Sequence, residues 1–144
     1  MNHYFLLNYL EKWEEYHFKK ILKELKQTNI SFTLENILEI INQTSFLIRS
    51  EKYPNECPYY PERKPCHNVL KLNCFLCACP EYKKEKNEGG CGLDSKLGKW
   101  HYHPNLPAGK IWDCSDCPTP HYPEYIKDYL IKNLDKLKKQ TDNL

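Results

Sequence analysis

The chain has 144 residues, and its 21 Lys and Arg nearly balance its 19 Asp and Glu, for a formal net charge of +2. This balance excludes a strongly basic nucleic-acid coat protein and an acidic tail protein, and the aromatic content of 13% excludes a disordered chain. No run of 18 apolar residues is present, so no transmembrane helix is expected. The apolar start lacks a basic region and a cleavage site, and Glu11, Glu14 and Glu15 follow it, so we expect a cytoplasmic protein.

The first 52 residues contain no Cys, Pro or Gly, and their apolar residues recur with a helical period. This pattern predicts one helix over residues 4–27 and a second over residues 34–50, with Thr33 as its N-cap. A short link between two amphipathic helices is typical of an antiparallel hairpin. The apolar positions are Leu7, Leu10, Trp13, Phe18, Ile21, Leu22 and Leu25 in the first helix, and Leu34, Ile37, Leu38, Ile41, Ser45 and Ile48 in the second.

The middle of the chain holds all eight Cys, all ten Pro and all five Gly, between residues 54 and 123. Proline ends helical structure there, and a short hairpin near 99–102 and 111–113 is the regular structure that we expect. The segment has too few aliphatic residues for a core of its own. Something other than apolar burial must therefore brace it.

A third helix is predicted over residues 124–139, where Pro123 and Glu124 suit a helix N-terminus. Its apolar stripe consists of Ile126, Tyr129, Leu130, Leu134 and Leu137. We therefore expect a mainly α fold with little sheet, in which a helical hairpin and a C-terminal helix pack on irregular, metal-braced loops. The expected parts are a helical hairpin at 1–52 and a cysteine-rich domain with the C-terminal helix at 53–144, sharing one core.

The eight cysteines indicate metal ligation more than disulfides or buried free thiols. Disulfides need an oxidising compartment, and no export signal is seen. Many of these cysteines lie beside Pro or Gly, which is not the setting of a core thiol. From Tyr53 to Tyr125, nine Lys and Arg balance nine Asp and Glu, so eight thiolates would add an uncompensated negative charge that cations offset.

The spacing of the cysteines supports this interpretation. Two C-x-x-C turns, Cys74–Cys77 and Cys114–Cys117, could together make one four-thiolate site, which leaves four cysteines for a second. An interleaved arrangement is equally consistent with the spacing, and Cys77 and Cys79 could serve one ion or two neighbouring sites. The candidate metal ligands are Cys57, Cys66, Cys74, Cys77, Cys79, Cys91, Cys114 and Cys117, with His67 and His121 as candidates to replace a thiolate.

Zinc, at about two sites, is slightly favoured over iron–sulfur clusters, because zinc suits C-x-x-C turns and tolerates His. Iron–sulfur clusters stay open because eight cysteines would serve two cubanes, although the C-x-x-C-x-C run at Cys74 is not the ferredoxin spacing. No catalytic residue is assigned, because closed four-thiolate sites favour structure over catalysis. His101 with His103 and Asp113 with Asp116 are interpreted as polar loop residues.

The ordered motifs resemble the cysteine-rich small domain family over roughly residues 53–137. The matching segments are Cys57-Pro58-Tyr59-Tyr60-Pro61, Cys66-His67, Asn73-Cys74-Phe75-Leu76-Cys77-Ala78-Cys79-Pro80-Glu81-Tyr82, Cys91-Gly92 and Asp113-Cys114-Ser115-Asp116-Cys117-Pro118-Thr119-Pro120-His121. The resemblance implies a zinc-finger-like metal-binding module with Cys ligands. Relatives of this kind are attached to enzymes of cobamide synthesis in some cases, which raises iron–sulfur chemistry somewhat.

Three functions follow as hypotheses. The first is a metal-binding module with structural metal that presents a surface to a partner protein. The second is an iron–sulfur redox module, with a link to cobamide metabolism, and the third is a metal chaperone or sensor. Nucleic-acid binding is disfavoured, because the cysteine-rich segment is neutral and the chain has only two arginines, Arg49 and Arg63.

Overall fold

The computed structural model describes the backbone of residues 3–144 and the side chains of Lys12 and of residues 14–144. Its elements are α1 (His3–Gln27), η1 (Leu34–Asn36), α2 (Ile37–Gln43), α3 (Phe46–Lys52), β1 (Lys99–Tyr102), β2 (Lys110–Asp113), η2 (Thr119–His121), α4 (Pro123–Lys132) and α5 (Leu134–Asp142). The mainly helical fold class with little sheet is confirmed. Among the described residues, no helix combines the length and the apolar character that crossing a membrane requires.

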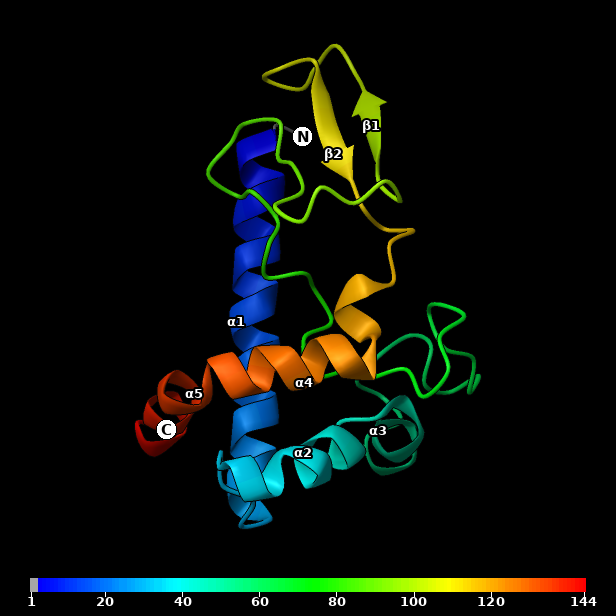
Figure 1. The fold of residues 1–144 in the computed structure, drawn as a ribbon. Helices are drawn as coiled ribbons and strands as arrows, with labels where there is room; N and C mark the ends of the chain where they lie inside the picture. Colours follow the sequence, from blue (N-terminus) through cyan, green and yellow to red (C-terminus); the bar gives the residue numbers. More distant parts are fainter. Residues whose placement is uncertain (1–2) are drawn as a thin grey trace.

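Helix α1 is the longest helix. Helix α4 crosses α1, and α2 lies across α1 closer to its C-terminal end (Figure 1). The apolar positions predicted for the C-terminal half of α1 are confirmed, since Ile21, Leu22 and Leu25 are buried. The positions Leu7, Leu10 and Trp13 lie outside the residues whose side chains are described. The core also takes apolar side chains from the middle and the end of the chain: Ile37, Ile40, Phe75, Leu76, Ile126, Leu130 and Leu137.

The helix predicted over residues 34–50 is divided into α2 and α3 at Thr44 and Ser45. The Thr44 hydroxyl donates back to Ile40 O at 2.7 Å, and the Ser45 side chain accepts from the main-chain N–H of Ile48 as the N-cap of α3. The Phe46 N–H then donates to Leu72 O at 2.9 Å. Because a partner from the cysteine-rich region takes this backbone group, the helix cannot continue. The predicted face is also partly wrong: Leu34 and Leu38 are exposed, while Ile40 is buried.

The helix predicted over residues 124–139 is likewise two helices, α4 and α5, which meet at Asn133. The Asn133 side chain donates to Tyr129 O at 2.8 Å and competes with the regular helical bond, so the chain turns there. The predicted apolar stripe is confirmed, with Ile126, Leu130 and Leu137 fully buried. The 3-10 turn η2 immediately before α4 carries His121 into the interior.

The cysteine-rich region runs as loops between α3 and η2, and its regular structure is one antiparallel hairpin. Strand β1 pairs with β2 so that Lys99 faces Asp113 and Trp100 faces Trp112. This hairpin, predicted near 99–102 and 111–113, lies toward the N-terminal end of α1 (Figure 1). The loops that carry the cysteines pack against the side of α1 and against α4.

Candidate metal centre

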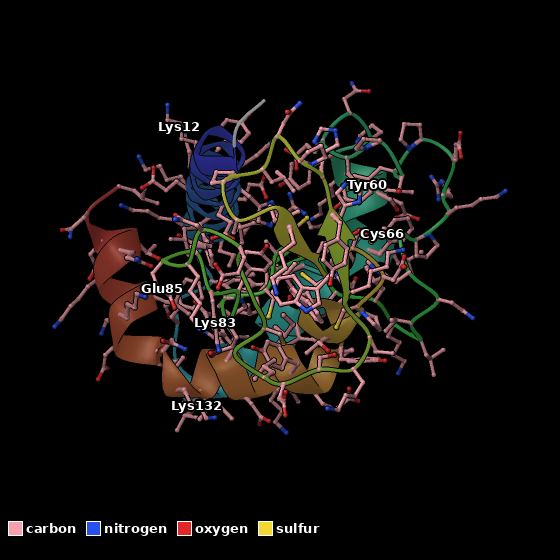
Figure 2. All side chains as sticks on the ribbon, turned by 90° about the horizontal axis from the view of Figure 1, so that it is seen from above. Lys12, Tyr60, Cys66, Lys83, Glu85 and Lys132 are labelled. Atoms are coloured by element: carbon pink, nitrogen blue, oxygen red, sulfur yellow. The ribbon has the colours of Figure 1, made fainter. Side chains whose placement is uncertain are left out.

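The fold sorts the eight cysteines into two groups around two cavities. The first cysteine set, Cys57, Cys66, Cys74 and Cys77, lines a cavity of about 140 Å³. The second cysteine set, Cys79, Cys91, Cys114 and Cys117, lines a cavity of about 580 Å³, which Cys77 also borders. All eight are free thiols. Figure 2 shows Cys66 of the first set close to Tyr60 beside α3, on the other side of the molecule from α5.

The thiols of the first set are held close enough to oppose one another's ionisation. Burial raises the pKa of Cys77 to about 12, and its neighbours Cys74, Cys57 and Cys66 add to the effect. Burial likewise raises the pKa of Cys74 to about 11, although a hydrogen bond from Tyr60 opposes it. Without a cation, these thiols therefore keep their protons, and a metal ion that binds would displace the protons.

In the second set, burial and neighbouring thiols act on Cys114 in the same way. Burial raises the pKa of Cys114 to about 11, and the other three thiols of the set, Cys79, Cys117 and Cys91, raise it further. Burial acts against ionisation of Cys117 too, but hydrogen bonds from Thr119 and Ser95 lower its pKa overall. In each set, buried thiols therefore sit close enough to neighbouring thiols that a cation would favour their ionisation, as at Cys74, Cys77 and Cys114.

The first C-x-x-C turn is positioned by Asn73, a fully buried residue. Its side-chain amide donates to Ile41 O at 2.8 Å, and its Oδ1 accepts from the Phe75 N–H at 2.8 Å. Its main-chain N–H donates to His121 O at 2.9 Å. Asn73 therefore ties this turn to α2 on one side and to the segment after the second turn on the other.

Helix α1 also supports the first set. His17 Nε2 donates to the main-chain oxygens of Cys74 and Phe75, at 2.9 and 3.0 Å. Burial lowers the pKa of His17 to about 4, so the imidazole is neutral near pH 7. The buried Arg49 pairs with Glu24 of α1 at 2.6 Å and with Glu56, and Lys20 of α1 pairs with Glu56 at 2.6 Å. Because Glu56 precedes Cys57, this ion cluster anchors the loop that carries the first thiol.

In the second set, the chain between Cys79 and Cys91 folds back on itself. Tyr82 and Cys91 form an isolated β-bridge, and the Tyr82 hydroxyl donates to Trp112 O at 2.7 Å. Gly89 adopts a φ of +70°, and a Cβ there would lie 2.2 Å from the Tyr82 hydroxyl oxygen, so only glycine fits. The contact with Trp112 of β2 brings this loop close to Cys114 and Cys117, which follow β2.

The two histidines among the predicted ligands lie beside Cys66. His67 Nδ1 is 3.3 Å and His121 Nε2 is 3.7 Å from Cys66 Sγ. The potential ligand atoms of these three residues all lie within 4.8 Å of one another, which makes them a group that could hold a metal ion. Burial, followed by the nearby His67, lowers the pKa of His121, although its hydrogen bond to Asn73 opposes the shift.

The grouping differs from the one predicted first, in which the two C-x-x-C turns share a site. Cys74 and Cys77 instead group with Cys57 and Cys66, and the turn at Cys114 belongs to the other set. Cys77 and Cys79, two residues apart, face different sets, one of the two alternatives that their spacing left open. Cys77 has a φ of +57°, and this left-handed residue turns the chain between the two sets.

Two supporting residues were not predicted, His17 and Asn73. For Asn73, the available signal was a polar residue between Leu72 and the apolar residues of the first C-x-x-C turn. Asp113, expected in a loop, is the last residue of β2. Its carboxylate accepts from the N–H and hydroxyl of Ser115 at 2.9 and 2.6 Å, which lowers its pKa. Asp116 pairs with Lys99 at 3.6 Å on the surface.

A family model described as "zf-like: Cysteine-rich small domain" matches residues 49–144 of the chain, which is more than half of its length. The match begins inside α3 and takes in every cysteine of both sets, His67 and His121, and the helices α4 and α5. Helices α1 and α2 lie outside it. No curated protein and no solved structure matches the chain.

Proposed function

The chain belongs to the cysteine-rich small domain family, a zinc-finger-like group, and its general role is metal binding. From this premise we propose that each cysteine set holds one structural zinc ion through four thiolates. The division of eight thiols into two sets of four, each around its own cavity, carries the proposal. Zinc in structural sites takes four ligands in a tetrahedral arrangement, and four thiolates are a common choice.

The donor chemistry of both sets fits a divalent cation. Buried thiols whose ionisation is opposed by their neighbours become good ligands once a cation compensates their charge. The segment that carries them is otherwise neutral, and Arg49 is the buried cation near the first set. Four thiolates also close the coordination shell, which supports a structural rather than a catalytic role.

Structural metal ions would also stabilise the loops, which contain few aliphatic residues. The apolar packing at the first set is a small cluster separate from the main core, Phe46, Tyr60, Leu72 and Cys74, with Cys57, Cys66 and Val69 packed against it. Metal bonds would hold the remaining loops in place. The resulting rigid surface suits an accessory module that binds a partner protein.

An iron–sulfur function is the second candidate, and the spacing of the thiols favours it. Zinc–sulfur bonds of about 2.3 Å place tetrahedral thiolates about 3.8 Å apart. Among the described residues, three potential ligand atoms within 4.8 Å of one another occur at Cys66, His67 and His121 rather than within a set of thiols. A four-iron cluster separates its thiolates more widely, and the cavity of about 580 Å³ at the second set has room for one.

Elemental analysis of protein purified without oxygen distinguishes the two candidates. Under the zinc proposal, the protein is colourless and holds two zinc ions per chain. A brown protein with sulfur-to-iron charge-transfer absorbance and four or more irons per chain would overturn the zinc proposal and support the iron–sulfur function. Protein without stoichiometric metal of either kind would overturn both.

A further inference from the structure

His67 and His121 lie beside Cys66 of the first set, and two four-thiolate centres leave both histidines unused. We propose that these three residues make a third metal site, a mixed nitrogen–sulfur site for a divalent cation of the zinc class. The proposal extends the function proposed above and rests on it for one point, the sharing of the Cys66 thiolate with the first set.

The hydrogen bonds of the two imidazoles determine which nitrogens face Cys66. His67 Nε2 lies 2.8 Å from Ser115 O, and His121 Nδ1 lies 2.9 Å from Asn73 O. A carbonyl oxygen only accepts, so in a ring with one N–H that hydrogen is on the nitrogen that faces the carbonyl. The nitrogens that face Cys66 Sγ, His67 Nδ1 and His121 Nε2, therefore carry lone pairs.

These lone pairs cannot both be satisfied within the protein. The Cys66 thiol has a single S–H, which can be donated to one of the two nitrogens at a time. The other nitrogen then faces a sulfur atom with no proton between them. A cation at this point would satisfy both nitrogens and the thiolate together, which is the donor set that zinc accepts.

The outer contacts resemble those of established metal ligands. A ligating His usually donates its second ring N–H to a carbonyl or a carboxylate, which fixes the tautomer and the ring orientation. Both rings do so here, through Ser115 of the second C-x-x-C turn and Asn73 before the first. The ring centroids of His67 and His121 are 5.2 Å apart with a tilt of 35°, and the potential ligand atoms of both rings lie within 4.8 Å of each other and of Cys66 Sγ.

The position of the site points to an exchangeable ion. His67 and His121 border the cavity of about 580 Å³, and Cys66 and His121 border the smaller cavity of the first set. Three protein ligands leave a fourth position for water or an external anion from the larger cavity. A thiolate sulfur keeps lone pairs after binding one ion, so Cys66 can bridge this ion and the ion of the first set.

Cobalt titration of the full chain tests the site. The protein is first dialysed until only tightly held metal remains. It is then titrated with Co²⁺ in the absence of oxygen, and the visible d–d absorbance is recorded. Co²⁺ binds such ligands more weakly than Zn²⁺ and does not displace it from closed sites. We expect one further equivalent to bind, and added azide to shift its d–d band through the open position.

The paired variant His67→Gln/His121→Gln should lose the additional cobalt signal, with affinity reduced by about tenfold or more. His103→Gln, at an exposed histidine, is the matched control and should bind cobalt as the wild type does. Because His121 is buried, His67→Gln alone is also measured, and it should weaken the signal with the fold intact by circular dichroism. Saturation without an additional equivalent, or a signal that survives in the paired variant, overturns the third site.

The four-thiolate proposal fails separately in the same experiment. If dialysed wild-type protein holds fewer than two metal ions per chain, that proposal is overturned. The histidine dependence of the cobalt signal still decides the third site in that case. The two results are therefore distinguishable.

Discussion

His17 Nε2, on α1, donates a hydrogen bond to the main-chain oxygen of Cys74 at 2.9 Å. The donor lies outside the part of the chain that matches the family, and the acceptor belongs to the first C-x-x-C turn within it. Helix α1 is therefore in direct contact with the candidate metal centre. It supports the turn whose two thiols belong to the first cysteine set.

Replacement of His17 tests this support. His17→Leu leaves the carbonyls of Cys74 and Phe75 without this donor, and we expect a loss of about 1–3 kcal/mol in the free energy of unfolding. His17→Gln keeps a side-chain N–H and should lose less. Urea unfolding of metal-loaded protein measures both variants. Equal stability of His17→Leu and wild type would show that the contact contributes nothing.

Phe75 lies inside the first C-x-x-C turn and is fully buried, with its ring against Phe18, Phe32 and Tyr129. Phe75→Ala removes this packing and should lower the free energy of unfolding by about 3–5 kcal/mol. Leu38→Ala is the control, because Leu38 is 71% exposed and its loss should change stability by about 0.5 kcal/mol or less. A Phe75→Ala protein as stable as the Leu38→Ala protein would place the core elsewhere.

Metal removal should unfold the cysteine-rich loops. We expect anaerobic chelation to open residues 53–122 to trypsin, because these loops have little apolar core and their buried thiols lose the cation that holds them. Mass spectrometry of the fragments locates the cuts at the lysines of this segment and at Arg63. Unchanged digestion and circular dichroism after complete metal removal would contradict a structural role for the metal.

The helices α1 and α2 should be necessary for the matched segment. A fragment of residues 49–144 loses Ile21, Leu22 and Ile40 from the core and exposes the faces of Ile126 and Leu130. We expect it to aggregate or to unfold at much lower urea than the full chain, as judged by size-exclusion chromatography and urea titration. A fragment that stays monomeric and equally stable would show that the two parts do not depend on a shared core.

Local patterns in the sequence predicted much of the fold. The helix predicted over 4–27 corresponds to α1, and the hairpin near 99–102 and 111–113 corresponds to β1 and β2. The breaks at Thr44 and Asn133 were not predicted, because they depend on polar side chains that donate hydrogen bonds to main-chain carbonyl oxygens of the preceding helix turn. At Thr44 the competing partners come from Leu72 and Asn73, far along the chain.

The grouping of the cysteines shows the same limit. A C-x-x-C spacing indicates that two thiols of one turn can share an ion, but it does not say which turns meet. That choice depends on long-range contacts, such as Asn73 N–H to His121 O and the Tyr82 hydroxyl to Trp112 O. The identity of the candidate ligands was therefore accessible from the sequence, and their division into sets was not.

Counting metal ions in paired cysteine variants tests the two-centre account most directly. Native mass spectrometry of dialysed Cys57→Ser/Cys77→Ser and Cys91→Ser/Cys114→Ser proteins should show one ion each, because each variant disables one set. Cys77→Ser/Cys117→Ser disables both sets and should show none. If the two C-x-x-C turns instead share one ion, the first two variants each lose both ions and Cys77→Ser/Cys117→Ser keeps one, and that result would contradict the division into two sets.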